Sequence, residues 1–199
     1  MSVYKKSVVV VVILAVASIA GLAYKVVLSD TSKQAQTVVL SSSVYKNDEY
    51  GFSFSYPSIS KNSELNKDDE AAKILLRLQQ QTSPEYLVTV RAETGLRLPS
   101  SLSRQDSLQL VVSGALAANP RRYTEYKLES DSTILIQNKP AHVIVFTYKS
   151  PAGALVKQQL LLFSNNSNSA VYIAMQSKES DFDTTNKEVF KNIVQSIVF

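Results

Sequence analysis

The sequence predicts an α+β domain in which an antiparallel β-sheet is flanked by helices, and one N-terminal transmembrane helix precedes this domain. Three observations support the prediction. An uncharged apolar stretch of 18 residues lies near the N-terminus. Short runs of alternating apolar and polar residues follow one another from residue 44 onward. Turn-forming residues separate these runs, as is typical of antiparallel strands, and two segments have the periodicity of helices that pack on a sheet.

The apolar stretch, residues 7–24, contains no charged side chain. As an α-helix it would extend about 27 Å, which is close to the roughly 30 Å hydrocarbon core of a bilayer. Further apolar residues continue it to residue 28, and the long stem of Lys25 lets its ammonium group reach the headgroups. We therefore predict a transmembrane anchor over residues 7–28.

Lys5 and Lys6 precede the span and favour a cytoplasmic leader over residues 1–6. The alternative is a cleaved signal peptide, because small residues around Ala20 and Ala23 could serve a signal peptidase. The first interpretation gives a single-pass plasma-membrane protein with a cytoplasmic N-terminus and an extracytoplasmic C-terminal domain. The second gives a secreted protein. Both place the rest of the chain outside the cytoplasm.

The composition excludes several kinds of chemistry. The chain has no cysteine, which excludes disulfides, thiolate metal sites, cysteine nucleophiles and a thioether-linked lipid. The formal charge of +4 arises mainly from Lys5, Lys6 and Lys25, because all 17 acidic residues lie beyond residue 28 and leave that part at +1. A nearly neutral region has no long-range field that attracts nucleic acid. With five glycines, the chain also has no glycine-rich phosphate loop.

A polar linker, residues 29–43, separates the span from the predicted domain at residues 44–199. The linker is rich in serine, threonine and glutamine, and we predict a mostly flexible stalk. Its apolar triplet at residues 38–40 could instead pair as a short edge strand. The domain has the size of one ordinary folding unit and shows no internal repeat.

The domain is predicted to open with two β-hairpins. The first hairpin has its first arm at residues 44–46, its turn at residues 47–49 and its second arm at residues 50–57. Aromatic residues occupy positions 50, 52, 54 and 56 of the second arm, which places them on one face of the strand, and Pro57 should end it. The second predicted hairpin has its arms at residues 73–80 and 86–92, joined by turn-forming residues.

A helix is predicted to begin at Ser103, because Ser103 and Asp106 resemble a capping box and apolar residues then recur on one face. Asn119 and Pro120 are predicted to stop it. Strand-like runs then follow at residues 123–129, 133–137, 142–148, 155–163 and 170–176. A closing helix is predicted over residues 185–195, with Thr185 and Glu188 as its capping box.

These elements carry a family resemblance. The opening EYGFSFSYP, the central helix, the antiparallel strands and a closing helix that ends in residues 196–199 together resemble the PsbP-like family. That family includes many membrane-anchored or lipid-anchored bacterial domains. The resemblance covers nearly all of residues 44–199, although the family's frequent tryptophan after the Tyr-Pro pair is absent and Ile59 stands near its place. It implies an antiparallel sheet sandwiched between helices. Plant members assist photosystem II, whereas bacterial members largely lack an assigned activity.

Candidate catalytic and metal-binding groups are few. His142, the single histidine, lies in an apolar alternating run, and we interpret it as structural because no Gly-x-Ser-x-Gly elbow supplies a nucleophile for it. Asp181 and Asp183 alternate as in a calcium loop, but Asn186 and Asn192 stand where that loop needs glycine and glutamate. We interpret the two aspartates as partners of the positive end of the closing helix. The sequence thus predicts no catalytic residue, no cofactor and no metal.

Two charged segments have simple interpretations. The acidic residues 68–70 are flanked by lysines and are predicted to form a solvated loop. Residues 121–123 and 126–127 interleave cations with tyrosines, as patches that stack bases do. Five such residues on a nearly neutral domain are too few, so nucleic acid is not expected as a partner.

These observations favour a membrane-anchored, extracytoplasmic, non-catalytic binding or accessory module. Residues 7–28 would bind the membrane, and the domain would engage an envelope protein or ligand. Tyrosines combine an apolar ring with a polar tip, and the candidate ligand surface comprises Tyr45, Tyr86, Tyr123 and Tyr148. Two alternatives stay open: a structural assembly subunit that packs through its N-terminal helix, and an extracytoplasmic hydrolase around His142. The hydrolase requires His142 to lie in a cleft beside a carboxylate or a hydroxyl.

Overall fold

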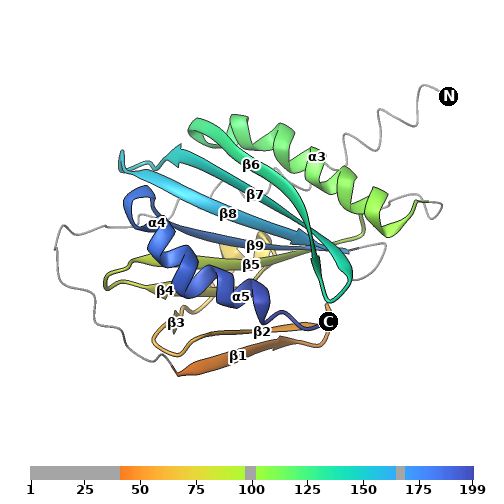
Figure 1. The fold of residues 1–199 in the computed structure, drawn as a ribbon, viewed down its shortest axis with the longest axis horizontal. Helices are drawn as coiled ribbons and strands as arrows, with labels where there is room; N and C mark the ends of the chain where they lie inside the picture. The colour runs from red at the N-terminus through yellow and green to blue at the C-terminus, as the bar shows by residue number, and fades with distance from the viewer. Residues whose placement is uncertain (1–40, 97–101, 165–168) are drawn as a thin grey trace.

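The computed structural model describes residues 41–96, 102–164 and 169–199 (Figure 1). Its strands are β1 (Ser42–Asn47), β2 (Phe52–Pro57), β3 (Lys61–Asn62), β4 (Ile74–Gln80), β5 (Tyr86–Thr94), β6 (Thr124–Ile136), β7 (Lys139–Lys149), β8 (Leu155–Phe163) and β9 (Ser169–Lys178). Its helices are α2 (Lys67–Ala71), α3 (Arg104–Arg122), α4 (Glu179–Thr185), the π-helical turn η1 (Asn186–Phe190) and α5 (Lys191–Gln195).

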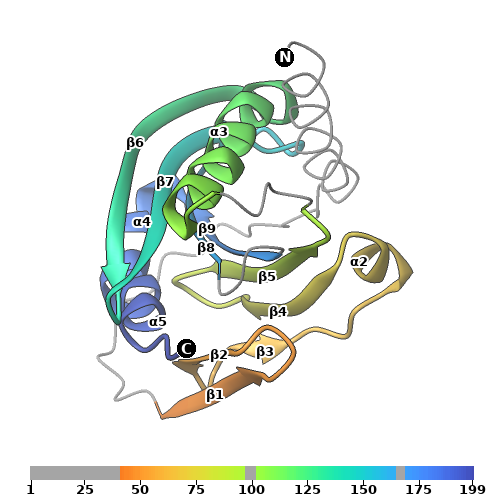
Figure 2. The same ribbon diagram turned by 90° about the vertical axis from the view of Figure 1, so that its right-hand side faces the viewer.

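Seven strands form one sheet in the order β3-β4-β5-β9-β8-β7-β6. Every neighbouring pair in this sheet is antiparallel, which confirms the predicted α+β class. The last strand, β9, lies between β5 and β8, so the C-terminal part of the chain joins the two halves of the sheet. The β6–β7 end curves away from the rest, as Figure 2 shows.

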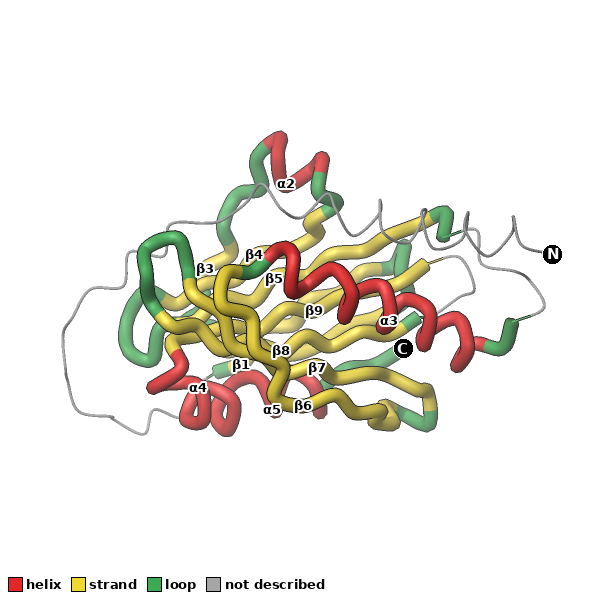
Figure 3. The backbone as a smooth tube through the Cα atoms, turned by 90° about the horizontal axis from the view of Figure 1, so that it is seen from above, coloured by secondary structure: helices red, strands yellow, loops and turns green. Residues whose placement is uncertain are grey.

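Helices cover both faces of this sheet, so the domain is an α/β/α sandwich. Helix α3 lies across one face, and Figure 3 looks onto that side, with α2 at the β4 end. The segment α4–η1–α5 and the β1–β2 hairpin cover the other face. The larger core lies on that second face and includes Phe54, Phe163 and Phe190. The smaller core lies beneath α3 and includes Ile144 and Phe146.

The predicted opening hairpin is confirmed. Strands β1 and β2 form a separate two-stranded sheet, and Phe52 and Phe54 are buried on its inner face, together with Tyr50 of the turn. Strand β2 begins at Phe52 rather than at residue 50, because Gly51 takes a φ of 64° in the turn. An isolated bridge between Ser53 and Val198 ties the hairpin to the C-terminal end of the chain.

Helix α3 begins where the sequence predicts. The Ser103 hydroxyl oxygen accepts a hydrogen bond from the Asp106 backbone N–H at 3.1 Å. The prediction that Asn119 and Pro120 stop the helix is wrong, because α3 continues to Arg122. Proline removes one donor from the last turn, but the Asn119 carbonyl still accepts from the Tyr123 N–H at 3.0 Å and closes that turn.

The closing helix begins earlier than predicted. Strand β9 passes directly into α4 at Glu179, without a turn signal between them. Thr185 therefore lies inside the helical segment, where it is fully buried and donates its hydroxyl to the Asp181 carbonyl at 2.9 Å. The predicted capping box of Thr185 and Glu188 is thus wrong. Asp181 and Asp183 lie within α4 itself, and Asp181 occupies its acidic first turn.

The predicted strands at residues 123–129 and 133–137 are one continuous strand, β6. Its central residues are polar because β6 is an edge strand whose side chains stay largely exposed. Two register shifts, between Thr124 and Lys127 and between Leu128 and Ser130, bend this strand. The turn that follows is Gln137–Asn138, with φ values of 48° and 62°. Strand β7 therefore begins at Lys139, three residues before the predicted run at 142–148.

The predicted leader, the span at residues 7–28 and all but the end of the linker lie outside the described residues. Within the described ranges, no helix is long and apolar enough to cross a membrane. Strand β1 begins at Ser42, two residues before the predicted start of the domain at residue 44.

Candidate functional site

The four candidate tyrosines do not form one surface. Tyr123 and Tyr148 lie together beneath α3, with ring centroids 4.5 Å apart. Tyr86 is buried in the opposite core, where its ring meets Phe190 edge-on and its hydroxyl lies 2.5 Å from the Ser60 hydroxyl.

Tyr45 is the fourth candidate, and it is half-buried on the inner face of the hairpin. Its ring lies 5.9 Å from that of Phe52 and 5.4 Å from that of Phe54. The structure therefore brings two of the four predicted residues together, Tyr123 and Tyr148.

Tyr123 and Tyr148 belong to a group of buried and half-buried polar side chains that we call the α3-side cluster. Its members come from the sheet and from the end of α3, namely Arg91, Glu93, Arg122, Tyr123, Tyr148, Gln158, Tyr172 and Gln176. The sheet members share one face because side chains alternate along each strand. On β5, for example, Val88, Val90 and Ala92 point into the larger core, and Arg91 and Glu93 point toward α3.

The cluster is held together by contacts between strands that are far apart in the sequence. Arg91 of β5 stands opposite Tyr172 of β9, and its guanidinium carbon lies 4.8 Å from the Tyr172 ring centroid. The Glu93 carboxylate pairs with the Arg91 guanidinium and accepts the Tyr172 hydroxyl at 3.1 Å. Nearer the other end of the strands, the Tyr148 hydroxyl donates to Gln176 Oε1 at 3.1 Å.

Burial determines the ionisation of this cluster. It lowers the pKa of Arg91 to about 10, and the nearby positive charge of Arg122 acts in the same direction, while Tyr172 opposes it. Arg91 is therefore still charged at neutral pH. Burial raises the pKa of Tyr148, and Tyr123 adds to that rise. Burial also raises the pKa of Tyr123, although Arg122 and a bond to Gln158 oppose the rise. The tyrosines are neutral hydrogen-bonding groups across the physiological range.

Residues 121–123 and 126–127 interleave cations with tyrosines, and the two tyrosines of this segment point inward. The Tyr123 and Tyr126 rings each lie 5.1 Å from the Phe146 ring, in the core beneath α3. These rings pack against the sheet, whereas a base-stacking platform presents its aromatic faces to solvent.

His142 is 5% exposed and lies on β7 beside the edge strand. Its Nε2 atom contacts the Asp131 carboxylate, and its Nδ1 atom lies 3.3 Å from the Thr133 hydroxyl. Asp131 and Thr133 both belong to β6, and Thr133 stands directly opposite His142 in the register. The histidine therefore has both a carboxylate and a hydroxyl as neighbours, but it is buried at this position.

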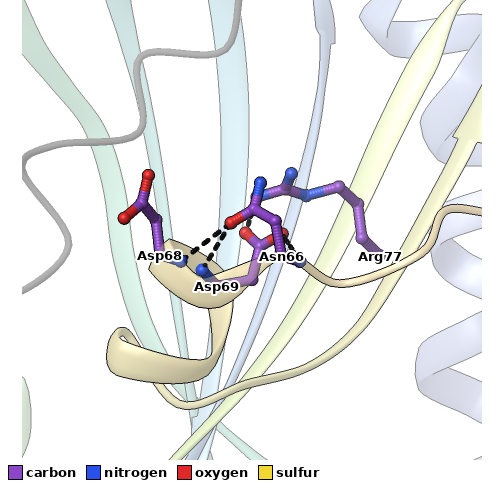
Figure 4. A network of polar contacts seen from close by, with 4 residues as sticks. All are labelled: Asn66, Asp68, Asp69 and Arg77. Atoms are coloured by element: carbon purple, nitrogen blue, oxygen red, sulfur yellow. Dashed lines mark hydrogen bonds and ion pairs between the residues drawn. The ribbon is translucent and has the colours of Figure 1, made fainter.

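The acidic residues 68–70 are not a solvated loop, and this prediction is corrected. They lie in α2, and the side chain of Asp69 is fully buried. Asp69 Oδ1 accepts from Arg77 Nη2 at 2.5 Å, and its other oxygen accepts from the Asn66 backbone N–H at 3.1 Å. Asn66 in turn caps α2 by accepting from the Asp68 and Asp69 N–H groups (Figure 4).

Among the described residues, no group of three or more histidine, cysteine, aspartate or glutamate side chains is arranged to hold a metal ion.

Sequence reasoning missed the main buried charges, Arg91, Glu93, Asp69 and Arg77. Alternation in residues 86–92 already separates Arg91 from the apolar Val88 and Val90. It cannot show that α3 covers the face that Arg91 occupies. Register across strands far apart in sequence decides which groups meet, and no short-range pattern encodes that.

Comparison with solved structures identifies the architecture. The fold is similar to that of cyanobacterial PsbP from Synechocystis sp. PCC 6803. The TM-score is 0.57 at 10% identity, over 84% of this chain and 97% of that one. LpqN from Mycobacterium tuberculosis, described as involved in cell envelope biogenesis, gives a TM-score of 0.52 at 10% identity, over 81% of this chain and 86% of that one.

A protein of unknown function from Pseudomonas aeruginosa, PA94, gives a TM-score of 0.51 at 12% identity, over 79% of this chain and 96% of that one. The chain therefore has the PsbP-like fold, as the sequence resemblance implies. No protein-family model and no curated protein matches the sequence.

Proposed function

We propose that this protein is a membrane-anchored, extracytoplasmic PsbP-like module that binds a partner or ligand in the cell envelope and has no catalytic activity. The observation that carries this proposal is the combination of an uncharged apolar stretch at residues 7–24 with a PsbP-like domain that begins at Ser42. The fold is shared with LpqN, which is described as involved in cell envelope biogenesis. At 10% identity that likeness supports an accessory role in general terms and names no partner.

The arrangement of the polar side chains supports binding rather than catalysis. In the α3-side cluster, Glu93 is engaged by Arg91 and Tyr172, and Tyr148 donates to Gln176. Burial keeps the tyrosine hydroxyls protonated, so they do not act as bases at neutral pH. Polar side chains that bond to one another in this way make the domain rigid. A rigid domain can present a binding surface that changes little when a partner binds.

The first test is whether the chain stays at the membrane. We expect the full-length chain in the membrane fraction, resistant to alkaline extraction. A matched variant carries Val11→Lys and Ala15→Lys in the span, where each lysine costs about 2.5–3.5 kcal/mol, and it should lose membrane retention. Mass spectrometry of the N-terminus separates the two predicted fates. A mature N-terminus near Gly21 or Tyr24 would show a discarded signal peptide rather than an anchor.

The second test is recovery of a partner. In-cell crosslinking of the full-length chain should recover a specific envelope component, with the lysine variant of the span as the matched control for location. Recovery of nothing beyond that control, together with a ligand screen that gives no thermal shift, would contradict the proposal.

A hydrolase centred on His142 is the second candidate function, because its ring nitrogens contact Asp131 and Thr133. A histidine between a carboxylate and a hydroxyl is the arrangement used in nucleophilic hydrolysis. This candidate predicts ester or amide hydrolysis that Thr133→Val and His142→Gln both abolish and that Tyr123→Phe leaves unchanged. A structural assembly subunit is the remaining alternative, and a dispersed monomer in detergent would reject it.

A further inference from the structure

The outer edge of β6 has no neighbouring strand among the residues that the structure describes. Residues 131–136 of β6 pair with β7 without a register shift and end in a two-residue turn. In such a hairpin the residues that flank the turn exchange both backbone hydrogen bonds, and every second residue repeats this pattern. Asp131, Thr133 and Leu135 therefore direct their backbone N–H and C=O groups away from β7.

This outward-facing segment extends equally far on both sides of Thr133. The residue skipped by the register shift, Glu129, lies four positions before Thr133, and the first turn residue, Gln137, lies four positions after it. A second antiparallel copy with Thr133 opposite Thr133 would match every outward group of Asp131, Thr133 and Leu135. Each copy's bulge would then lie opposite the other copy's turn.

We infer that β6 pairs with β6 of a second copy of this chain, about a two-fold axis that passes through Thr133. Such an interface is closed, because each copy uses the same edge. The two sheets would become one continuous antiparallel sheet, and the exposed edge would be covered. Natural proteins protect a long sheet edge by covering it, charging it or bending it. In β6 the bulges protect the first half of the strand, and the second half is left for a partner.

The charges and the side chains fit a second copy. Asp131 is the only charged residue in the paired segment, and its carboxylate already contacts His142. In the proposed register Asp131 lies opposite Leu135, so no two like charges face each other. Leu135 is 70% exposed in the single chain, and pairing would cover part of it. The chain beyond residue 28 carries a formal charge of +1, so two copies repel each other little.

The absence of cysteine allows a direct test on the full-length chain in mild detergent. Thr133→Cys places the two thiols opposite each other, with Cα atoms about 5.5 Å apart, within the roughly 4.4–6.8 Å that a disulfide spans. The matched control is Ser132→Cys, whose two copies would stand diagonally at about 7–8 Å. We expect oxidation to give a covalent dimer at least about tenfold faster for Thr133→Cys. Equal rates, or no covalent dimer from Thr133→Cys, would overturn the inference.

Light scattering gives a second measurement that needs no cysteine. The wild-type chain should have the mass of a dimer at micromolar concentration. Leu135→Lys changes an exposed side chain, so the fold should be kept, and the lysine on the edge should shift the mass to that of a monomer. A monomeric wild type would overturn the inference. A dimer that Leu135→Lys leaves intact would also overturn it, because the contact would then lie elsewhere, for instance in the N-terminal span.

Discussion

The buried ion pair between Asp69 and Arg77 offers the sharpest test of the energetics. The Asp69 side chain is fully buried, that of Arg77 is 6% exposed, and the two groups lie 2.5 Å apart. Replacing Arg77 by methionine keeps a long side chain but leaves the Asp69 carboxylate buried without its cation. Removal of one partner of a buried pair costs about 3–5 kcal/mol. That is a large share of the roughly 5–15 kcal/mol that stabilises a typical domain.

The second change in this test is Asp69→Asn. Asparagine has the shape of aspartate and keeps an oxygen that can accept the Asn66 N–H, so the cap of α2 can persist. The double variant Asp69→Asn/Arg77→Met leaves no charge buried at this site. We therefore expect the double variant to be about 1–3 kcal/mol more stable than Arg77→Met alone.

The assay is urea unfolding of the full-length chain in mild detergent at neutral pH, followed by far-ultraviolet circular dichroism. The midpoint should shift while the slope of free energy against urea stays constant. Lys46→Met is the matched control, because Lys46 also pairs with an aspartate, Asp48 at 2.7 Å, but in an exposed position. It should change stability by less than about 0.5 kcal/mol. The reasoning fails if Arg77→Met resembles Lys46→Met, or if the double variant is less stable than Arg77→Met.

Three further predictions follow. Phe146→Ala should destabilise the domain by about 3–5 kcal/mol in urea unfolding, because this buried ring contacts three tyrosine rings beneath α3; a loss below about 1 kcal/mol would contradict the packing. Asn138→Ala should cost about 1 kcal/mol and Asn138→Gly little, since the φ of 62° favours glycine or asparagine; equal thermal midpoints for the two variants would refute this. Above about pH 10 stability should fall, because unfolded tyrosines ionise there while the buried Tyr123 and Tyr148 keep their protons in the folded state. Arg91, with its lowered pKa, acts in the opposite sense but is a single group. Urea unfolding below and above about pH 10 measures the change, and a midpoint that stays constant or rises above that pH would contradict this prediction.

Short-range patterns predict most of the strands. Residues 155–163 of the sequence prediction coincide with β8, and residues 170–176 lie inside β9, because a half-buried or buried strand has a clear apolar pattern. The apolar pattern wrongly divides β6 into two predicted strands, because the side chains of this edge strand are mostly exposed and need not alternate between apolar and polar. The start of α4 was missed for a related reason: β9 joins it directly, so no turn residue marks the boundary.

The candidate site was less predictable than the fold. Tyr123 and Tyr148 do meet, but Tyr86 and Tyr45 belong to the opposite core. The alternation of side chains along a strand shows which residues share a face, but it does not show which helix covers that face. The buried pair of Asp69 and Arg77 has an equally non-local origin. The acidic run at residues 68–70 shows three charges and nothing of the arginine on β4 that neutralises one of them.

The separate β1–β2 hairpin determines how the domain would respond to tension. The chain enters this hairpin at Ser42, whose partner is Pro57, and the turn lies at the far end of the two strands. A pull on the preceding linker therefore acts on the open end and would unzip the pairs one after another, beginning with Ser42 and ending at Asn47. The seven-stranded sheet makes no ladder with β1 and would stay intact. Strand β1 would thus detach from β2 at a lower force than the seven-stranded sheet needs to unfold, and it would pair with β2 again when the pull ends.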